Sequence, residues 1–180
     1  MRLFYMDNND FRDMNLDWVK TLSFFIVLLL VQVLVFNHIH LFGYATPLLY
    51  VYFVLPARRG FPKWALLLWA FLLGLSVDVF SNTPGLAAAS MTLVALIQPY
   101  LLELFVPRDS PDDLKPSFRS LGAAKYMFYT FILVFVYSVV FFSLEIFSFF
   151  NWLQWLASAG GSMLLTLVMV WVIENLVKRE

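Results

Sequence analysis

Five long apolar runs decide what this chain can fold into, because each has 20 residues or more. A helix needs about 20 apolar residues to cross the hydrocarbon core of a membrane. The runs predict spans at 17–36, 62–81, 84–106, 123–148 and 151–177. With 62% hydrophobic and 13% charged residues, the chain has more apolar surface than a soluble domain of 180 residues can bury. We expect an all-α integral membrane protein.

A sixth apolar segment, LFGYATPLLYVYFVLPA at 41–57, is shorter and contains Pro47 and Pro56. Taken alone, it fits either a span or a re-entrant segment that returns to the side it came from. The two prolines predict a short helix with irregular backbone on its outer side, sheltered from lipid by neighbouring helices.

The basic residues favour the spanning alternative. With six spans and a cytoplasmic N-terminus, all twelve Lys and Arg lie on the cytoplasmic side, whereas five spans would divide them between both sides. The positive-inside rule therefore predicts six spans. The four basic clusters are Arg2, Arg12 and Lys20; Arg58, Arg59 and Lys63; Arg108, Lys115, Arg119 and Lys125; and Lys178 and Arg179.

The resulting domain plan is simple. A cytoplasmic tail at 1–16 precedes one six-helix membrane domain at 17–177, which has an inner linker at 107–122, and the cytoplasmic C-terminus is 178–180. No small-residue cleavage site follows the first run, so we interpret it as a retained helix. The absence of cysteine excludes disulfides and thiolate metal sites, and zero net charge gives no argument for nucleic-acid binding.

The stretch GLSVDVFSNTPG at 74–85 places one acid, Asp78, near the outer end of the third span. Both burial and the negative end of its own helix dipole disfavour an ionised carboxylate there, so it needs a partner. We expect Thr83 to be the N-cap of the next helix, Pro84 its first residue, and Gly85 the place where two helices meet.

Two interpretations of Asp78 stay open. It is either a binding or proton-handling acid, or it joins a helical hairpin by bonding to Ser81, Asn82 and the N-terminus of the fourth span. Glu145 shares a helix face with Thr130 and Tyr137 and is expected in the same leaflet as Asp78.

Further alternatives concern that outer leaflet. The two acids either form a working pair for a cation or protons, or are separately satisfied. His38 and His40 could hold a metal only with help from these acids, so no metal site is predicted, and no cofactor is expected. No catalytic triad, phosphate loop or zinc signature is present, so we expect no enzyme activity.

The last span carries polar residues at steps of four, Ser158, Ser162 and Thr166, with Gly160 and Gly161 beside them. Small residues let helices approach closely, so this row serves either internal packing or contact with a partner's transmembrane helix. Elsewhere, Glu103 and Glu174 near the inner helix ends are expected to snorkel and pair with basic residues.

These features together resemble the MreD family of bacterial rod shape-determining membrane proteins, over roughly residues 20–177. The Asp-to-turn stretch and HIHLFGYATPLLYVYFVLP around Pro47 carry the resemblance, together with the chain length and the short outer loops. The acidic first sixteen residues and Glu145 do not map onto the family. The positions that match the family's motif are Gly74, Asp78, Ser81, Thr83, Pro84 and Gly85.

The resemblance implies a fold similar to the substrate-binding subunits of energy-coupling-factor transporters. It also implies a non-enzymatic scaffold of the elongation machinery for peptidoglycan, located in the bacterial cytoplasmic membrane. Its direct partner would be MreC, and through MreC it would meet MreB, RodA and a penicillin-binding transpeptidase; a homo-oligomer is also allowed. The alternative is a small-molecule carrier with an outward pocket lined by Asp78, Glu145 and the Tyr137 face.

Overall fold

The computed structural model describes residues 8–35, 47–107, 110–111, 113–145 and 152–179. All the regular elements in these ranges are helices, and no strand occurs among the described residues. In chain order they are α1 Asn8–Leu34, the 3₁₀ helix η2 Leu49–Phe53, α2 Lys63–Ser81, α3 Leu86–Phe105, α4 Ala123–Glu145 and α5 Trp152–Arg179.

Four of these helices are long and apolar enough to span a membrane: α2, α3, α4 and residues Trp155–Leu176 of α5. Helix α1 begins at Asn8, within the segment 1–16 that was expected to be a tail. Its apolar part, Val19–Leu34, is shorter than those of the other four helices. Large apolar side chains point outward, with Val79 73% and Leu104 80% exposed. The prediction of a multi-pass membrane protein agrees with this length, composition and exposure.

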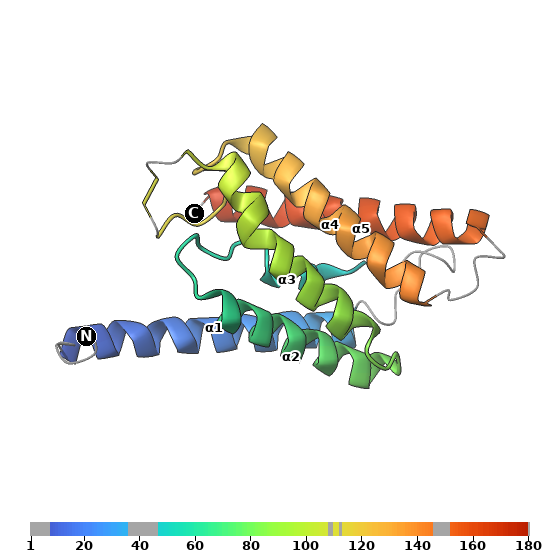
Figure 1. Cartoon of the computed structure of the whole chain (residues 1–180), viewed down its shortest axis with the longest axis horizontal. Helices are drawn as coiled ribbons and strands as arrows, with labels where there is room; N and C mark the ends of the chain where they lie inside the picture. The colour runs from blue at the N-terminus through green and yellow to red at the C-terminus, as the bar shows by residue number, and fades with distance from the viewer. Residues whose placement is uncertain (1–7, 36–46, 108–109, 112, 146–151, 180) are drawn as a thin grey trace.

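The helices alternate in direction except at one point. In Figure 1, α1 and α2 both run from left to right, after which α3, α4 and α5 alternate, and both chain ends lie on the left. Neighbours along the chain pack together as α2 on α3, α3 on α4, and α4 on α5. We call the end with the chain termini the inner end, and the end with the α2–α3 turn the outer end.

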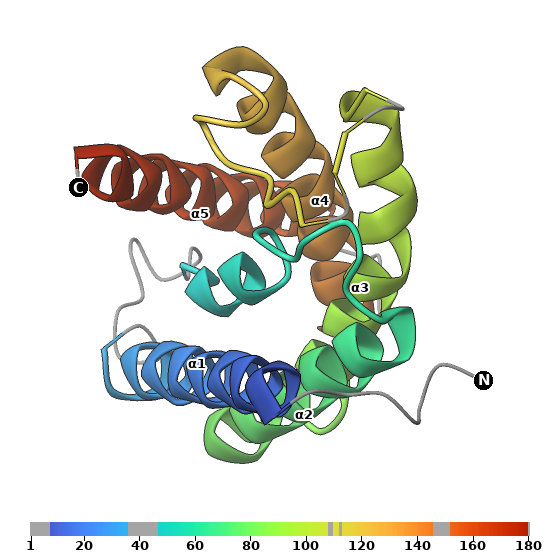
Figure 2. The same cartoon turned by 90° about the vertical axis from the view of Figure 1, so that its left-hand side faces the viewer.

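Because α1 and α2 run in parallel, the chain must come back between them. Residues 47–59, which we call the return segment, make this passage through the interior, and Figure 2 shows η2 lying between α1 and α5. Residues 47–55 are all buried. In residues 47–57, the described part of the expected segment 41–57, the only helix is the five-residue η2, and the backbone around it is irregular.

Side chains from the flanking helices bind the first residues of the return segment. Gln32 of α1 donates from Nε2 to the Pro47 carbonyl at 3.1 Å and accepts from the Leu49 N–H at 3.0 Å. Thr166 of α5 accepts from the Leu48 N–H through Oγ1 at 3.1 Å. A buried backbone outside a regular helix needs such partners, since lipid offers none.

Side chains of α3 and α4 bind the backbone near the end of the return segment in the same way. The Tyr129 hydroxyl donates to the Leu55 carbonyl at 3.1 Å, and Gln98 donates to the Ala57 carbonyl at 3.2 Å. Gln98 also donates to the Tyr129 hydroxyl at 2.9 Å, which links the two donors. The return segment is therefore fixed by side chains of α1, α3, α4 and α5.

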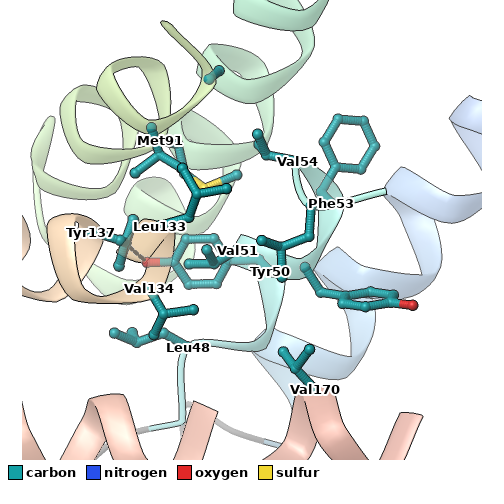
Figure 3. Packing of buried hydrophobic residues seen from close by; sticks show 14 of the residues in the cluster. Leu48, Tyr50, Val51, Phe53, Val54, Met91, Leu133, Val134, Tyr137 and Val170 are labelled. Atoms are coloured by element: carbon teal, nitrogen blue, oxygen red, sulfur yellow. Dashed lines mark hydrogen bonds between the residues drawn. The ribbon is translucent and has the colours of Figure 1, made fainter. Parts of the chain in front are cut away.

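The centre of the core lies where the return segment meets α4. The hydroxyls of Tyr50 and Tyr137 are hydrogen-bonded, and their rings pack edge to face with centroids 5.7 Å apart. Figure 3 shows Met91, Leu133 and Val134 around this pair. Both tyrosines are buried, so their packed rings occupy the centre of the bundle.

Candidate functional site

Asp78 lies on the last turn of α2, faces α3, and is 3% exposed. Its Oδ1 accepts from the Thr83 hydroxyl and the Ala87 N–H, both at 2.9 Å, and its Oδ2 accepts from the Ala88 N–H at 2.9 Å. Both carboxylate oxygens are therefore used by the turn and the first turn of α3.

The Asp78 carboxylate lies at the N-terminus of α3, against the N–H groups of its first turn. The first N–H groups of a helix have no partner within the helix and carry the positive end of its dipole, so a carboxylate placed there is stabilised. The end of α2 closes on the same residue, because the N–H groups of Asn82 and Thr83 donate to the Asp78 carbonyl. Asp78 thus joins both helices. Of the partners that the hairpin alternative named, the start of α3 bonds to the carboxylate, whereas Asn82 bonds through its own N–H to the Asp78 carbonyl.

The details of the turn differ from the prediction. Helix α3 begins at Leu86 and its N-cap is Gly85, so the expected cap at Thr83 and the expected helix start at Pro84 are wrong. Thr83 bonds to Asp78 instead, and Pro84 lies exposed in the turn after Ser81, the last residue of α2. The reason is that the Asp78 carboxylate already supplies the acceptors that an N-cap side chain would offer.

The helices meet at Gly74 and not, as was predicted, at Gly85. A Cβ atom at Gly74 would lie 2.6 Å from both the Ala87 carbonyl oxygen and the Ala88 Cα, so Gly74 is where α2 and α3 meet. A Cβ atom at Gly85 would meet nothing within 4 Å, so space does not require glycine there. Its φ of +83° does, because glycine adopts this conformation without strain. Gly74 precedes Asp78 by one turn on the same face, so the close approach brings the carboxylate within reach of α3.

The structure does not bring Glu145 into this site. Thr130 and Tyr137 face the bundle interior as expected, but Glu145 is the exposed last residue of α4 and is not among the hydrogen-bond partners of Asp78. No group of three or more metal-ligating side chains occurs within the described ranges. His38 and His40 lie outside those ranges.

The polar row of α5 faces inward. Ser158, Ser162 and Thr166 are buried, while Gly160 is exposed and Gly161 half-buried. The Thr166 hydroxyl donates to the Ser162 carbonyl at 2.7 Å while accepting from the return segment. Of the two alternatives for this row, internal packing is the one that fits its burial.

Glu174 is the residue that the sequence analysis placed wrongly. Instead of snorkelling, it is 4% exposed, and its Oε1 accepts from the hydroxyls of Tyr52 at 2.9 Å and Tyr126 at 2.8 Å. It continues the four-residue step of the inward row through Val170, and that spacing was the available signal. Glu103, by contrast, is exposed on α3. Glu174 therefore links the return segment, α4 and α5 inside the bundle.

The concavity found at the outer end among the described residues has a different lining from the outward pocket expected of a carrier. A shallow depression at the outer end includes Asp78, but neither Glu145 nor Tyr137 lines it. Its lining residues are Leu75, Asp78, Val79, Asn82, Pro84 and Gly85. The Tyr137 ring instead stacks on Phe141 inside the core, with centroids 5.7 Å apart.

The polar groups of the described core bind mainly to one another and to the backbone. Comparison of the chain with protein-family models, with curated proteins and with solved structures finds no match.

Proposed function

We propose that this protein is a non-enzymatic membrane scaffold of the bacterial elongation machinery, which builds the side wall, and that it binds MreC through its membrane helices. It crosses the cytoplasmic membrane six times with both termini in the cytoplasm, in a fold like that of energy-coupling-factor substrate-binding subunits. The observation that carries the proposal is the use of both Asp78 oxygens to join α2 to α3, which leaves this acid a structural task.

The motif behind the resemblance supports this view residue by residue. Gly74 allows the close approach, Asp78 and Thr83 form the bonds across it, and Gly85 supplies the positive φ before α3. Each of these residues has a reason to be there that requires no ligand. A rigid outer hairpin without a domain of its own fits a protein that acts by holding a partner.

The exposed faces offer the partner surface. Because the inward row of α5 is committed to the core, MreC would contact the outward apolar side chains of the helices, such as Leu104 and Leu164. Through MreC the protein would meet RodA and the transpeptidase. The inner linker 107–122 and the two chain ends would face MreB.

The first experiment is purification after crosslinking in native membranes, followed by mass spectrometry of what is recovered. We expect a single-span protein with a large periplasmic coiled-coil domain. Recovery of a transporter's ATPase module in its place would overturn the scaffold proposal and favour the carrier.

Two matched acid variants sharpen this test. Asp78→Asn is expected to lower the yield of the complex, because an amide cannot accept all three hydrogen bonds that the carboxylate accepts. Glu145→Gln is the control, since Glu145 is exposed and takes no part in the hairpin. Unchanged cell shape and unchanged complex yield in the double variant would contradict the weight given to Asp78.

A further inference from the structure

A second concavity lies at the inner end, away from the Asp78 hairpin. It has a volume of about 250 Å³ and lies where α1, the return segment and α2 meet beside the inner linker. It is lined by Lys20, Thr21, Phe24, Phe53, Pro56, Ala57, Arg58, Phe61, Leu66, Trp69 and Lys115. We call it the inner pocket.

The charges of the inner pocket are all of one sign. Lys20 comes from α1, Arg58 from the return segment and Lys115 from the linker, and the described residues that line the pocket include no acid. Arg58 also forms an ion pair with the exposed Asp113, whose Oδ1 lies 3.6 Å from Arg58 Nη1 and which is not among the lining residues. Three basic clusters that are far apart in the sequence therefore meet at one cavity.

The linker is held in place next to this cavity. The Arg59 N–H donates to the Leu114 carbonyl at 3.2 Å, and Arg59 Nη1 donates to the Ser110 carbonyl at 3.0 Å. These bonds fix the chain immediately before Lys115 against the end of the return segment. The position of the third cation is therefore built into the fold.

The rest of the lining is aromatic and apolar. Phe24 lies one helical turn beyond Lys20 toward the middle of the bundle, and its ring stacks on Phe53 with centroids 5.8 Å apart. Trp69 and Leu66 of α2 line the pocket on the side facing α1. The inner pocket thus changes from cationic at its mouth to apolar in depth, as the interface of a membrane does.

We infer that the inner pocket binds a phosphate group that carries an apolar tail, namely the headgroup of an anionic phospholipid. Lys20, Arg58 and Lys115 contact the phosphate, and the first part of an acyl chain lies against Phe24 and Trp69. Basic pockets between membrane helices at the cytoplasmic face recognise acidic headgroups in this way. The inference rests on the proposed placement of the inner end at the cytoplasmic face of the membrane, but not on the binding of MreC.

The test measures lipid binding to the delipidated full-length protein by native mass spectrometry. The probes are phosphatidylglycerol, phosphatidylcholine with the same acyl chains, and free glycerol phosphate. We expect phosphatidylglycerol to bind at one preferred site, and the double variant Lys20→Gln with Lys115→Gln to bind it at least about tenfold more weakly. Lys20 and Lys115 are both exposed, so this variant keeps the fold.

The control is Lys125→Gln, which removes an exposed cation of α4 that does not line the pocket, and its binding should match the unaltered protein. Binding of free glycerol phosphate without preference for phosphatidylglycerol would assign the phosphate site to a soluble ligand. Equal binding of both lipids by the protein, or equal loss of binding in the Lys125 control, would overturn the inference.

Discussion

In both the α2–α3 hairpin and the return segment, side chains bind backbone groups that have no partner within a helix. The two regions differ in how far along the sequence these side chains lie. In the hairpin, Asp78 satisfies the turn and the start of α3 with partners at most ten residues away. In the return segment, the backbone is satisfied by Gln32, Thr166, Tyr129 and Gln98, which lie 15 to 118 residues from the groups they bind. One region is stabilised locally, and the other only by the assembled bundle.

This difference predicts how each region fails. A change in the hairpin should loosen α2 from α3, since the contacts are confined to that pair. A change in the side chains that hold the return segment should loosen several helices at once, because the segment lies among α1, α3, α4 and α5.

Asp78→Ala should have the largest effect. It leaves the N–H groups of Ala87 and Ala88 buried without an acceptor, and hydrogen bonds to a charged group contribute about 1.5–3 kcal/mol each. We expect a loss of about 3–5 kcal/mol in the free energy of unfolding, measured by titration with denaturing detergent. Glu145→Ala, the exposed counterpart, should change it by less than about 0.5 kcal/mol. Similar values for both variants would contradict the role given to the buried acid.

Gln32→Leu should come next, on the side of the return segment. It removes the donor to the Pro47 carbonyl and the acceptor of the Leu49 N–H, and each buried group left without a partner costs about 1–3 kcal/mol. We expect a loss of about 2–3 kcal/mol in the free energy of unfolding. Hydrogen exchange should rise in residues 47–55 while the α2–α3 hairpin stays protected. Loss of protection confined to α1 would argue against the proposed support of the return segment.

Gly74→Ala should have a smaller effect within the hairpin. The added Cβ would lie 2.6 Å from backbone atoms of α3, so the helices must separate. Because the clash is with backbone atoms, the cost should lie in the upper part of the about 1–3 kcal/mol that overpacking costs. Alanine returns about 1 kcal/mol of helix propensity, so we expect a net loss of about 1–2 kcal/mol. Gly160→Ala is the matched control, because nothing lies within 4 Å of its added Cβ, and it should be neutral or stabilising. A neutral Gly74→Ala would show that α2 and α3 are less closely packed.

Asn82→Gly should have the smallest effect and the opposite sign. Asn82 ends α2 with a φ of 56°, a left-handed conformation that glycine adopts more easily. We expect the melting temperature to rise slightly, by no more than the equivalent of about 0.5 kcal/mol. Asn82→Ala should lower the melting temperature, because alanine has the steric cost of a Cβ in the left-handed conformation and no polar group that could bond locally. If glycine also lowers it, the Asn82 side chain has a task beyond the turn.

The same contrast explains what the sequence could predict. The long helices are predicted by the apolar runs. The bond from Asp78 to the start of α3 is predictable because its partners, Ala87 and Ala88, follow only 9 and 10 residues later. The N-cap assignment of Thr83 failed because the acceptor came from the preceding helix. Glu174 was misplaced because its tyrosine partners lie 48 and 122 residues away, and the one sign of its burial in the sequence is its four-residue spacing from the inward row of α5.

The return segment was the hardest feature to predict. Its prolines indicated irregular backbone, but its partners on four helices are unknowable before those helices are arranged. The charge pattern nevertheless favoured a crossing at 41–57, and the direction of α1 and α2 in Figure 1 agrees with a chain that returns between them.

The most direct test of the account asks whether the return segment takes the chain across the membrane. The chain has no cysteine, so single-cysteine variants report one position each. Lys20→Cys, Gly60→Cys and Pro84→Cys introduce thiols at exposed sites before the return segment, after it and in the outer turn. A membrane-impermeant maleimide is applied to intact spheroplasts and then to permeabilised ones. The account predicts that Pro84→Cys reacts in intact spheroplasts and that Lys20→Cys and Gly60→Cys both react only after permeabilisation. Labelling of Lys20→Cys and Gly60→Cys from opposite sides would contradict it.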